Sequence, residues 1–410
     1  MPSATVTQLP VVADPECGSV VHFYNGKIYI INIAVDYVRI VNCTEKTAQE
    51  LSTGLSSDIT NKYPRIIDIK YKTGNTVVIR WIYIKSGYVV VVRAEVDLSA
   101  KTVSITEEVS HNLAWVSRWE EIAHSIVIPP FLWVAPNYED AYLHYVNLDD
   151  GSDLSADIGF GGYFPRPSTK YVALNDDIYM MLGRHYAGDQ VYLLSFYNKS
   201  AIGTGVSAGG GSPRVQIGSI ALFYNDVIFP CGWGGVSGSD NDIALFDHRM
   251  NHLGTLDLSS LTGWNDVDTM PGFTIFAKNK DGRYYALLAV RHSTGTSATP
   301  EGRLYFIEIT RTGSIVDSAL LHSFPMDDGA YFFTLLKPDS SDRTCVPVVD
   351  LRNKKIYTIV RVRKDNTWSS YLVEIDVSDI WDNIDEFNRA LWFVSPFRIP
   401  TTLTLSITPL

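Results

Sequence analysis

The chain alternates between short apolar segments and polar turns, and these segments recur in two interleaved series. In the first series a tight polar turn precedes an apolar or alternating segment of strand length. Segments of this kind, bounded by Gly, Asn and Asp, are typical of β-strands. Copies of this pattern start at Tyr24, Thr73, Asn175, Tyr224, Asp281 and Arg352, with a weaker copy near His124.

The second series consists of apolar segments that end in a polar turn. Its copies start at Tyr37, Val91, Tyr142, Tyr192, Ile243, Leu304 and Tyr371. The two series alternate along the chain, and neighbouring copies lie about 50 to 70 residues apart, a spacing typical of propeller blades with insertions. One such series arises easily by chance, but two in step indicate a repeated four-stranded unit.

This repeat predicts an all-β fold, namely a single β-propeller of about seven four-stranded blades over residues 19–387. Tandem β-sandwiches would not keep this period, and a β-solenoid would need a much shorter one. Residues 1–18 are predicted to form an N-terminal arm. Residues 388–410 are predicted to form a C-terminal strand or tail, which either closes the ring or pairs with an assembly partner.

The paired, degenerate repeats resemble those of the β-propeller superfamily in general, and loosely those of its quinoprotein-like and kelch-like members. The resemblance extends over residues 19–387 and implies a propeller fold. It does not reach a specific subfamily. The Gly-Gly doublet of kelch repeats is not repeated here, and the only Trp-Asp dipeptide is Trp381-Asp382.

Composition and charge narrow the class of protein. Apolar residues make up 46% of the chain and charged residues 19%, which is typical of a folded globular protein. The formal net charge of -11, without any run of Lys or Arg, argues against a nucleic-acid partner. The first residues do not form a secretory signal, and the chain has no apolar stretch of about 18 residues that would insert into a membrane.

The sequence predicts no metal and no cofactor. Its four cysteines, Cys17, Cys43, Cys231 and Cys345, lack the C-x-x-C spacing of zinc sites. They are either buried thiols or include a bridge between Cys17 and Cys345, and the pattern leaves both open. No H-E-x-x-H, G-x-S-x-G or P-loop motif occurs. Catalysis would therefore fall to scattered carboxylates, and the candidates are Glu120, Glu121, Asp266 and Asp268.

Loop lengths point to one face of the predicted propeller. The loops between the second and third strands of a blade, together with the connections between blades, are long in the later blades, including a loop over residues 361–370. The turns on the opposite face are short. Long loops on a rigid scaffold commonly carry binding residues. The candidate ligand-binding residues on this face are Tyr163, Arg184, His185, Trp233, Trp264, Arg291, His292 and Trp368.

Aromatic rings beside Arg and His suit sugars, peptides or anionic groups, although such rings also serve simply to wedge loops together. The sequence favours a non-enzymatic binding or structural propeller that recognises a glycan or a protein. We expect it to be displayed on a virion or a cell surface. The alternatives are a glycoside hydrolase or lyase, with carboxylates at the mouth of the propeller, and an intracellular protein-interaction scaffold.

Overall fold

The fold is known from a computed structural model of the chain. The residues that the structure describes are 2–12, 18–55, 64–113, 115–116, 125–128, 132–136, 142–153, 156–157, 165–174, 177–184, 191–195, 200–204, 216–217, 220–232, 242–249, 251–262, 272–291, 300–327, 332–334 and 347–394.

The strands in these residues form seven sheets, and the first four sheets have four strands each. The first sheet contains β2 (Gly18–Tyr24), β3 (Lys27–Ile33), β4 (Tyr37–Asn42) and β5 (Thr47–Ser52). The second contains β6 (Arg65–Thr73), β7 (Thr76–Lys85), β8 (Tyr88–Asp97) and β9 (Thr102–Asn112). The third contains β10 (Ile126–Ile128), β11 (Leu132–Pro136), β12 (Tyr142–Asn147) and β13 (Ala156–Asp157). The fourth contains β14 (Pro165–Leu174), β15 (Asp177–Arg184), β16 (Val191–Ser195) and β17 (Ser200–Thr204).

The last three sheets have additional strands. The fifth contains β18 (Gln216–Ile217), β19 (Ala221–Leu222), β20 (Val227–Gly232), β21 (Asp242–Phe246) and β22 (His252–Asp257), and the helix α2 (Leu258–Thr262) follows it. The sixth contains β23 (Gly272–Asn279), β24 (Tyr284–Arg291), β25 (Glu301–Ile309), β26 (Ile315–Pro325) and β31 (Ile384–Phe387). The seventh contains β27 (Phe332–Thr334), β28 (Val348–Asp350), β29 (Lys355–Lys364), β30 (Thr367–Asp376), β1 (Ser3–Gln8) and β32 (Trp392–Val394).

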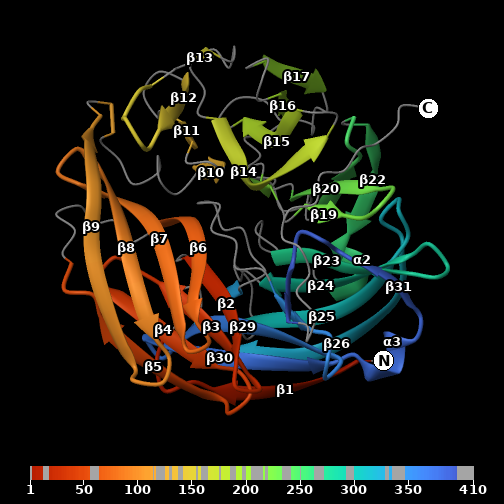
Figure 1. The fold of residues 1–410 in the computed structure, drawn as a ribbon. Coiled ribbons are helices and arrows are strands. Elements are labelled where there is room, and N and C mark those ends of the chain that lie inside the picture. The colour runs from red at the N-terminus through yellow and green to blue at the C-terminus, as the bar shows by residue number, and fades with distance from the viewer. Residues whose placement is uncertain are drawn as a thin grey trace.

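The sheets are arranged around a common centre, which makes the fold a β-propeller (Figure 1). The strands β6, β14 and β23 lie nearest the centre, whereas β9 and β1 lie at the rim. The all-β propeller expected from the repeats is thereby confirmed. The count of about seven four-stranded blades stays a prediction.

Both faces of the first sheet are buried against neighbouring sheets, which explains why its strand β3 is almost continuously apolar. In β3, Ile31 packs in a cluster with Trp81 of the second sheet. The next residue toward the N-terminus, Ile30, packs with Ile359 and Leu372 of the seventh sheet. Side chains along a strand alternate between faces, so one strand joins two interfaces and the first and seventh sheets are neighbours.

Tight turns join several of the strands. Asn25 and Gly26 between β2 and β3 have φ values of 48° and 76°, and Asp365 and Asn366 between β29 and β30 have values of 51° and 59°. Two residues with positive φ form the turn type that matches the twist of paired strands. The long loop predicted over residues 361–370 is therefore wrong, because Arg361 pairs directly with Ser370 across this hairpin.

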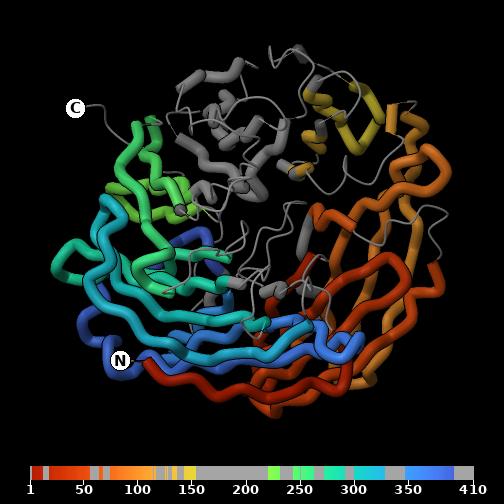
Figure 2. The backbone as a smooth tube through the Cα atoms, turned by 180° about the vertical axis from the view of Figure 1, so that it is seen from behind, coloured from red at the N-terminus to blue at the C-terminus, as the bar shows by residue number. Residues whose placement is uncertain are grey.

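The N-terminal strand completes the last sheet. β1 pairs antiparallel with β30, from Ser3 opposite Asp376 to Gln8 opposite Tyr371, and Figure 2 shows it running beside the C-terminal strands at the rim. Part of the predicted N-terminal arm is thus a strand of the propeller. Of the predicted C-terminal strand or tail at residues 388–410, residues 388–394 are described, and residues 395–410 lie outside the described residues.

A segment that we call the clasp, residues 378–394, follows β30. It contains the helix α3 (Ser378–Trp381), then β31, which pairs with β23 of the sixth sheet, and then β32, which runs parallel to β28. Between them Asn388 is fully buried and donates to the carbonyl oxygens of Ile220 and Ile275, at 3.1 and 2.7 Å. The clasp therefore ties three sheets together. Within the described residues, no helix is long and apolar enough to cross a membrane.

Candidate functional site

The structure describes few of the side chains that the sequence singles out. Tyr163, His185, Trp233, Trp264 and His292 lie outside the described residues, as do Glu120, Glu121, Asp266 and Asp268. Arg184 and Arg291 are the last residues of β15 and β24, so their backbones lie at the strand ends that lead into the predicted loops. Their role in binding stays a prediction.

Trp368 is the one predicted binding residue whose side chain is described. It is half-buried near the start of β30, and the Arg361 guanidinium lies 4.1 Å from the centroid of its ring. Arg361 sits diagonally opposite Trp368 in the hairpin register, a spacing at which long side chains meet. This cation–π pair was missed from the sequence because the hairpin was predicted to be a loop.

A cavity of about 400 Å³ lies between the first and second sheets. We call it the inter-sheet cavity. Its lining residues are Tyr24, Asn25, Lys27, Tyr29, Ile40, Asn42, Glu45, Thr47, Ala48, Gln49, Leu98, Ser99 and Lys101. They come from β2–β5 with their turns and from the turn between β8 and β9. The cavity therefore lies on the face of tight turns, opposite the face on which the sequence predicted the binding loops.

One ion pair crosses the wall of the cavity. The Lys27 ammonium pairs with one carboxylate oxygen of Glu45, and this hydrogen bond is the main reason that the pKa of Lys27 is raised. The Asn42 amide donates to the other oxygen at 2.9 Å, while the Glu45 backbone N–H donates to Asn42 Oδ1 at 3.0 Å. Both oxygens of Glu45 are therefore occupied, and its charge is balanced by Lys27.

Several other polar side chains in the wall are unengaged by any residue that the structure describes. Within the described part of the chain, no hydrogen bond or ion pair holds the hydroxyls of Tyr24 and Tyr29, the Gln49 amide or the Lys101 ammonium. Burial is the main cause that raises the pKa of Tyr29, which keeps its hydroxyl protonated as a donor. The volume of this cavity lies within the range of small-ligand sites.

A second polar cluster lies in the third sheet. His144 Nδ1 and Asp153 Oδ2 are 2.6 Å apart, and the Trp115 indole N–H donates to the same carboxylate oxygen at 2.9 Å. Trp115 stacks on the His144 ring with centroids 3.8 Å apart. His144 Nε2 and Asp153 Oδ1 are buried and have no hydrogen-bond partner among the residues that the structure describes. A carboxylate on Nδ1 places the ring hydrogen there and leaves Nε2 as an acceptor.

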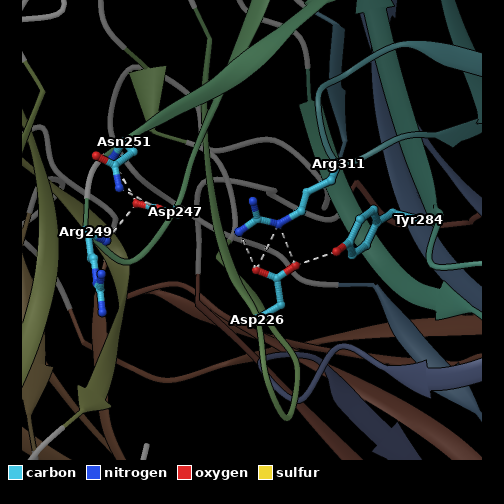
Figure 3. Close-up of polar contacts among 6 residues, drawn as sticks. All are labelled: Asp226, Asp247, Arg249, Asn251, Tyr284 and Arg311. Atoms are coloured by element: carbon cyan, nitrogen blue, oxygen red, sulfur yellow. Dashed lines mark hydrogen bonds and ion pairs between the residues drawn. The ribbon is translucent and has the colours of Figure 1, made fainter. Parts of the chain in front are cut away.

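A third cluster joins the fifth and sixth sheets (Figure 3). Asp226, in the turn between β19 and β20, accepts hydrogen bonds from Arg311 Nε and Nη2 at 3.1 and 3.0 Å, and one from the Tyr284 hydroxyl. Burial opposes the ionisation of Asp226. Its hydrogen bonds from Arg311 and Tyr284 outweigh this effect, and the pKa of Asp226 is lowered. Because every oxygen is engaged, we assign this cluster to stability and not to binding.

Comparison with known proteins finds distant fold likenesses only. No protein-family model and no curated protein matches the chain. It is similar to S. cerevisiae core factor at 11% identity, with a TM-score of 0.46, covering 94% of this chain and 65% of that one. It is also similar to virginiamycin B lyase from Staphylococcus aureus, at 9% identity and a TM-score of 0.40, covering 92% and 100% of the two chains.

The WD40 domain of SCAP from fission yeast is similar at 8% identity, with a TM-score of 0.41, covering 91% of this chain and 94% of that one. Likenesses at this level do not carry a function from one protein to the other. What this β-propeller binds or does must be argued from its own side chains.

Proposed function

We propose that the chain is a non-enzymatic binding β-propeller that recognises a glycan through the inter-sheet cavity. The observation that carries this proposal is the combination of two tyrosines with unengaged polar groups in one cavity wall. A tyrosine ring offers an apolar face for the C–H groups of a sugar and a hydroxyl for its oxygens. Display on a virion or a cell surface, inferred from the sequence, belongs to this proposal.

Two features indicate that the wall of the cavity is preorganised for binding. The turns that form its wall are held by their own hydrogen bonds, such as the one from the Glu45 backbone N–H to Asn42. The sheets behind it are closely packed, with Tyr29 and Trp81 in one buried cluster. A ligand therefore meets a rigid wall, and little conformational entropy is lost when it binds.

The test is glycan binding by the wild type and by Tyr24→Ala, measured on a glycan array and then by calorimetry. Removing one aromatic contact costs about 1 to 1.5 kcal/mol, so we expect about tenfold weaker binding. Tyr88→Ala is the matched control, because Tyr88 is an exposed tyrosine at the other end of the second sheet. Equal binding by both variants would refute the cavity as the site, and an array without any ligand would refute glycan recognition.

A second candidate function, a polysaccharide lyase or glycoside hydrolase, is favoured by the pair of His144 and Asp153. An imidazole oriented by a carboxylate, with its other nitrogen unoccupied, is a common proton acceptor in enzymes. This reading predicts that polysaccharide cleavage, measured as new chain ends, is lost in His144→Gln and retained in Tyr24→Ala. Binding without cleavage by the wild type would eliminate it.

A further inference from the structure

Some of the charged side chains in the inter-sheet cavity pair with each other and one does not. The unpaired charge indicates which class of ligand the cavity binds. We propose that the cavity selects an anionic sugar, whose acidic group pairs with the Lys101 ammonium. This inference rests on the proposed function, because it concerns the same cavity. It names the feature of the glycan that distinguishes it from neutral sugars.

The charge balance of the wall carries the first step. Three charged side chains line the cavity, namely Lys27, Glu45 and Lys101. Lys27 and Glu45 neutralise each other, and Asn42 occupies the second oxygen of Glu45. Lys101 is exposed, and no ion pair or hydrogen bond in the described residues engages its ammonium. The wall therefore carries one uncompensated positive charge in a chain whose formal net charge is -11.

The nearest acidic residue in the sequence does not neutralise Lys101. Asp97, at the end of β8, accepts hydrogen bonds at Oδ1 from the Ser99 and Ala100 backbone N–H groups, each at 2.8 Å. The Asn75 amide donates to the same oxygen at 3.1 Å. These hydrogen bonds, with that of Ala100 first, lower the pKa of Asp97. Asp97 Oδ1 therefore holds the turn, and within the described residues no ion pair joins Asp97 to Lys101, which stays available to a ligand.

The same hydrogen bonds make Lys101 part of a fixed wall. The Leu98 backbone N–H donates to the Asn75 carbonyl at 2.9 Å, so the turn between β8 and β9 is tied to the neighbouring turn. Lys101 itself adopts a φ of 57°, a conformation that such a closed turn stabilises. The backbone of the residue that carries the charge is thus positioned before any ligand arrives, which reduces the entropic loss on binding.

The neutral groups of the wall match the rest of a sugar. Gln49 can both donate and accept a hydrogen bond, and the hydroxyls of Tyr24 and Tyr29 can do the same. A carboxylate and a sulfate ester are both anionic acceptors for an ammonium, which binds as a point charge without the fork geometry of arginine. The chemistry shared by these ligands is therefore a hydroxylated ring with one negative charge.

The experiment compares galacturonic acid, galactose 6-sulfate and galactose by calorimetry with the wild type, Lys101→Gln and Lys364→Gln. We expect the wild type to bind at least one of the two anionic sugars about tenfold more tightly than galactose at low salt. The affinity ratio of anionic to neutral sugar should fall to about one in Lys101→Gln. Lys364 is a suitable control, because it is an exposed lysine at the end of β29 in another sheet and makes no ion pair with any described residue.

A variant with the opposite expectation strengthens the test. Glu45→Gln releases Lys27 from its ion pair and leaves the cavity with two unbalanced positive charges. It should therefore raise the affinity ratio of anionic to neutral sugar by several-fold. Addition of about 0.5 M salt should reduce this ratio in the wild type, because salt screens charges that solvent reaches.

The outcomes separate this inference from the proposed function. Binding of galactose that depends on Tyr24, with no preference for either anionic sugar, would overturn the anionic ligand and leave glycan recognition intact. An unchanged affinity ratio in Lys101→Gln would do the same. The absence of binding by all three sugars at high concentration, together with a glycan array that shows no ligand, would overturn both. A preference for only one of the anionic sugars supports the inference and identifies the acidic group.

Discussion

The contact between Asp226 and Arg311 offers the sharpest test of how the sheets are held together. Asp226 is only 9% exposed; its Oδ1 accepts from Arg311 Nη2, and its Oδ2 accepts from both Arg311 Nε and the Tyr284 hydroxyl. Arg311→Met removes the guanidinium and leaves a carboxylate between two sheets with Tyr284 as its main partner. Breaking a buried ion pair in this way costs about 3 to 5 kcal/mol.

The expected cost is smaller here, because the Arg311 side chain is 44% exposed and solvent already screens part of the interaction. We therefore expect Arg311→Met to lower the free energy of unfolding by about 2 kcal/mol, measured by equilibrium unfolding in urea. Arg249→Met is the matched control, because only its backbone N–H contacts the neighbouring Asp247. We expect the control to change stability by less than about 0.5 kcal/mol.

The pH dependence provides the sign of the effect. Asp226 has a pKa below its ordinary value of 3.8. A lowered folded-state pKa means that its stabilisation is present above pH 3.8 and is lost as the pH falls through the folded-state pKa. The difference in stability between the wild type and Arg311→Met should therefore be full at pH 7 and shrink below pH 3.8. The reasoning would be refuted if the stability difference between wild type and Arg311→Met were the same at pH 7 and below pH 3.8, or if there were no difference at pH 7.

Three further predictions concern other parts of the fold. Asn388→Ala should lower the free energy of unfolding in urea by about 3 kcal/mol, because two carbonyl groups bridged by its buried amide lose their donor. Deletion of residues 2–9 removes β1 and should leave the edge of β30 unpaired. The free edge should pair with another copy, and light scattering should detect this self-association. A monomer of unchanged stability would contradict this role for β1. The Cys43 thiol is fully buried and burial raises its pKa, so iodoacetamide should label it only after unfolding.

The repeated pattern was sufficient to predict the propeller, because the conformation of each turn and strand depends mainly on residues that are close together in the chain. Asn25-Gly26 is an example, since both residues adopt positive φ easily. The turn at Asp365-Asn366 has the same backbone conformation, but it was predicted to lie inside a long loop over residues 361–370. Its pairing became evident only from the register of β29 with β30.

The features that were missed depend on contacts between distant parts of the chain. The strand Ser3–Gln8 has the residue types of a strand, yet its partner lies more than 360 residues away, as the hydrogen bond from Gln8 to Ser369 illustrates. The inter-sheet cavity is formed by turns of two different sheets, and no single segment encodes it. Sequence patterns predict local elements well, but the gaps between packed elements follow from their final geometry.

The pairing of β1 with β30 has a consequence for how the protein is made. β1 finds its partner only when residues 371–376 have also emerged from the ribosome. Until then the last sheet lacks its outer strand, and the newly made sheets stand as an open row. We expect the ring to close only after residue 376 has emerged, and a pause or truncation before residue 371 to leave the nascent chain dependent on chaperones.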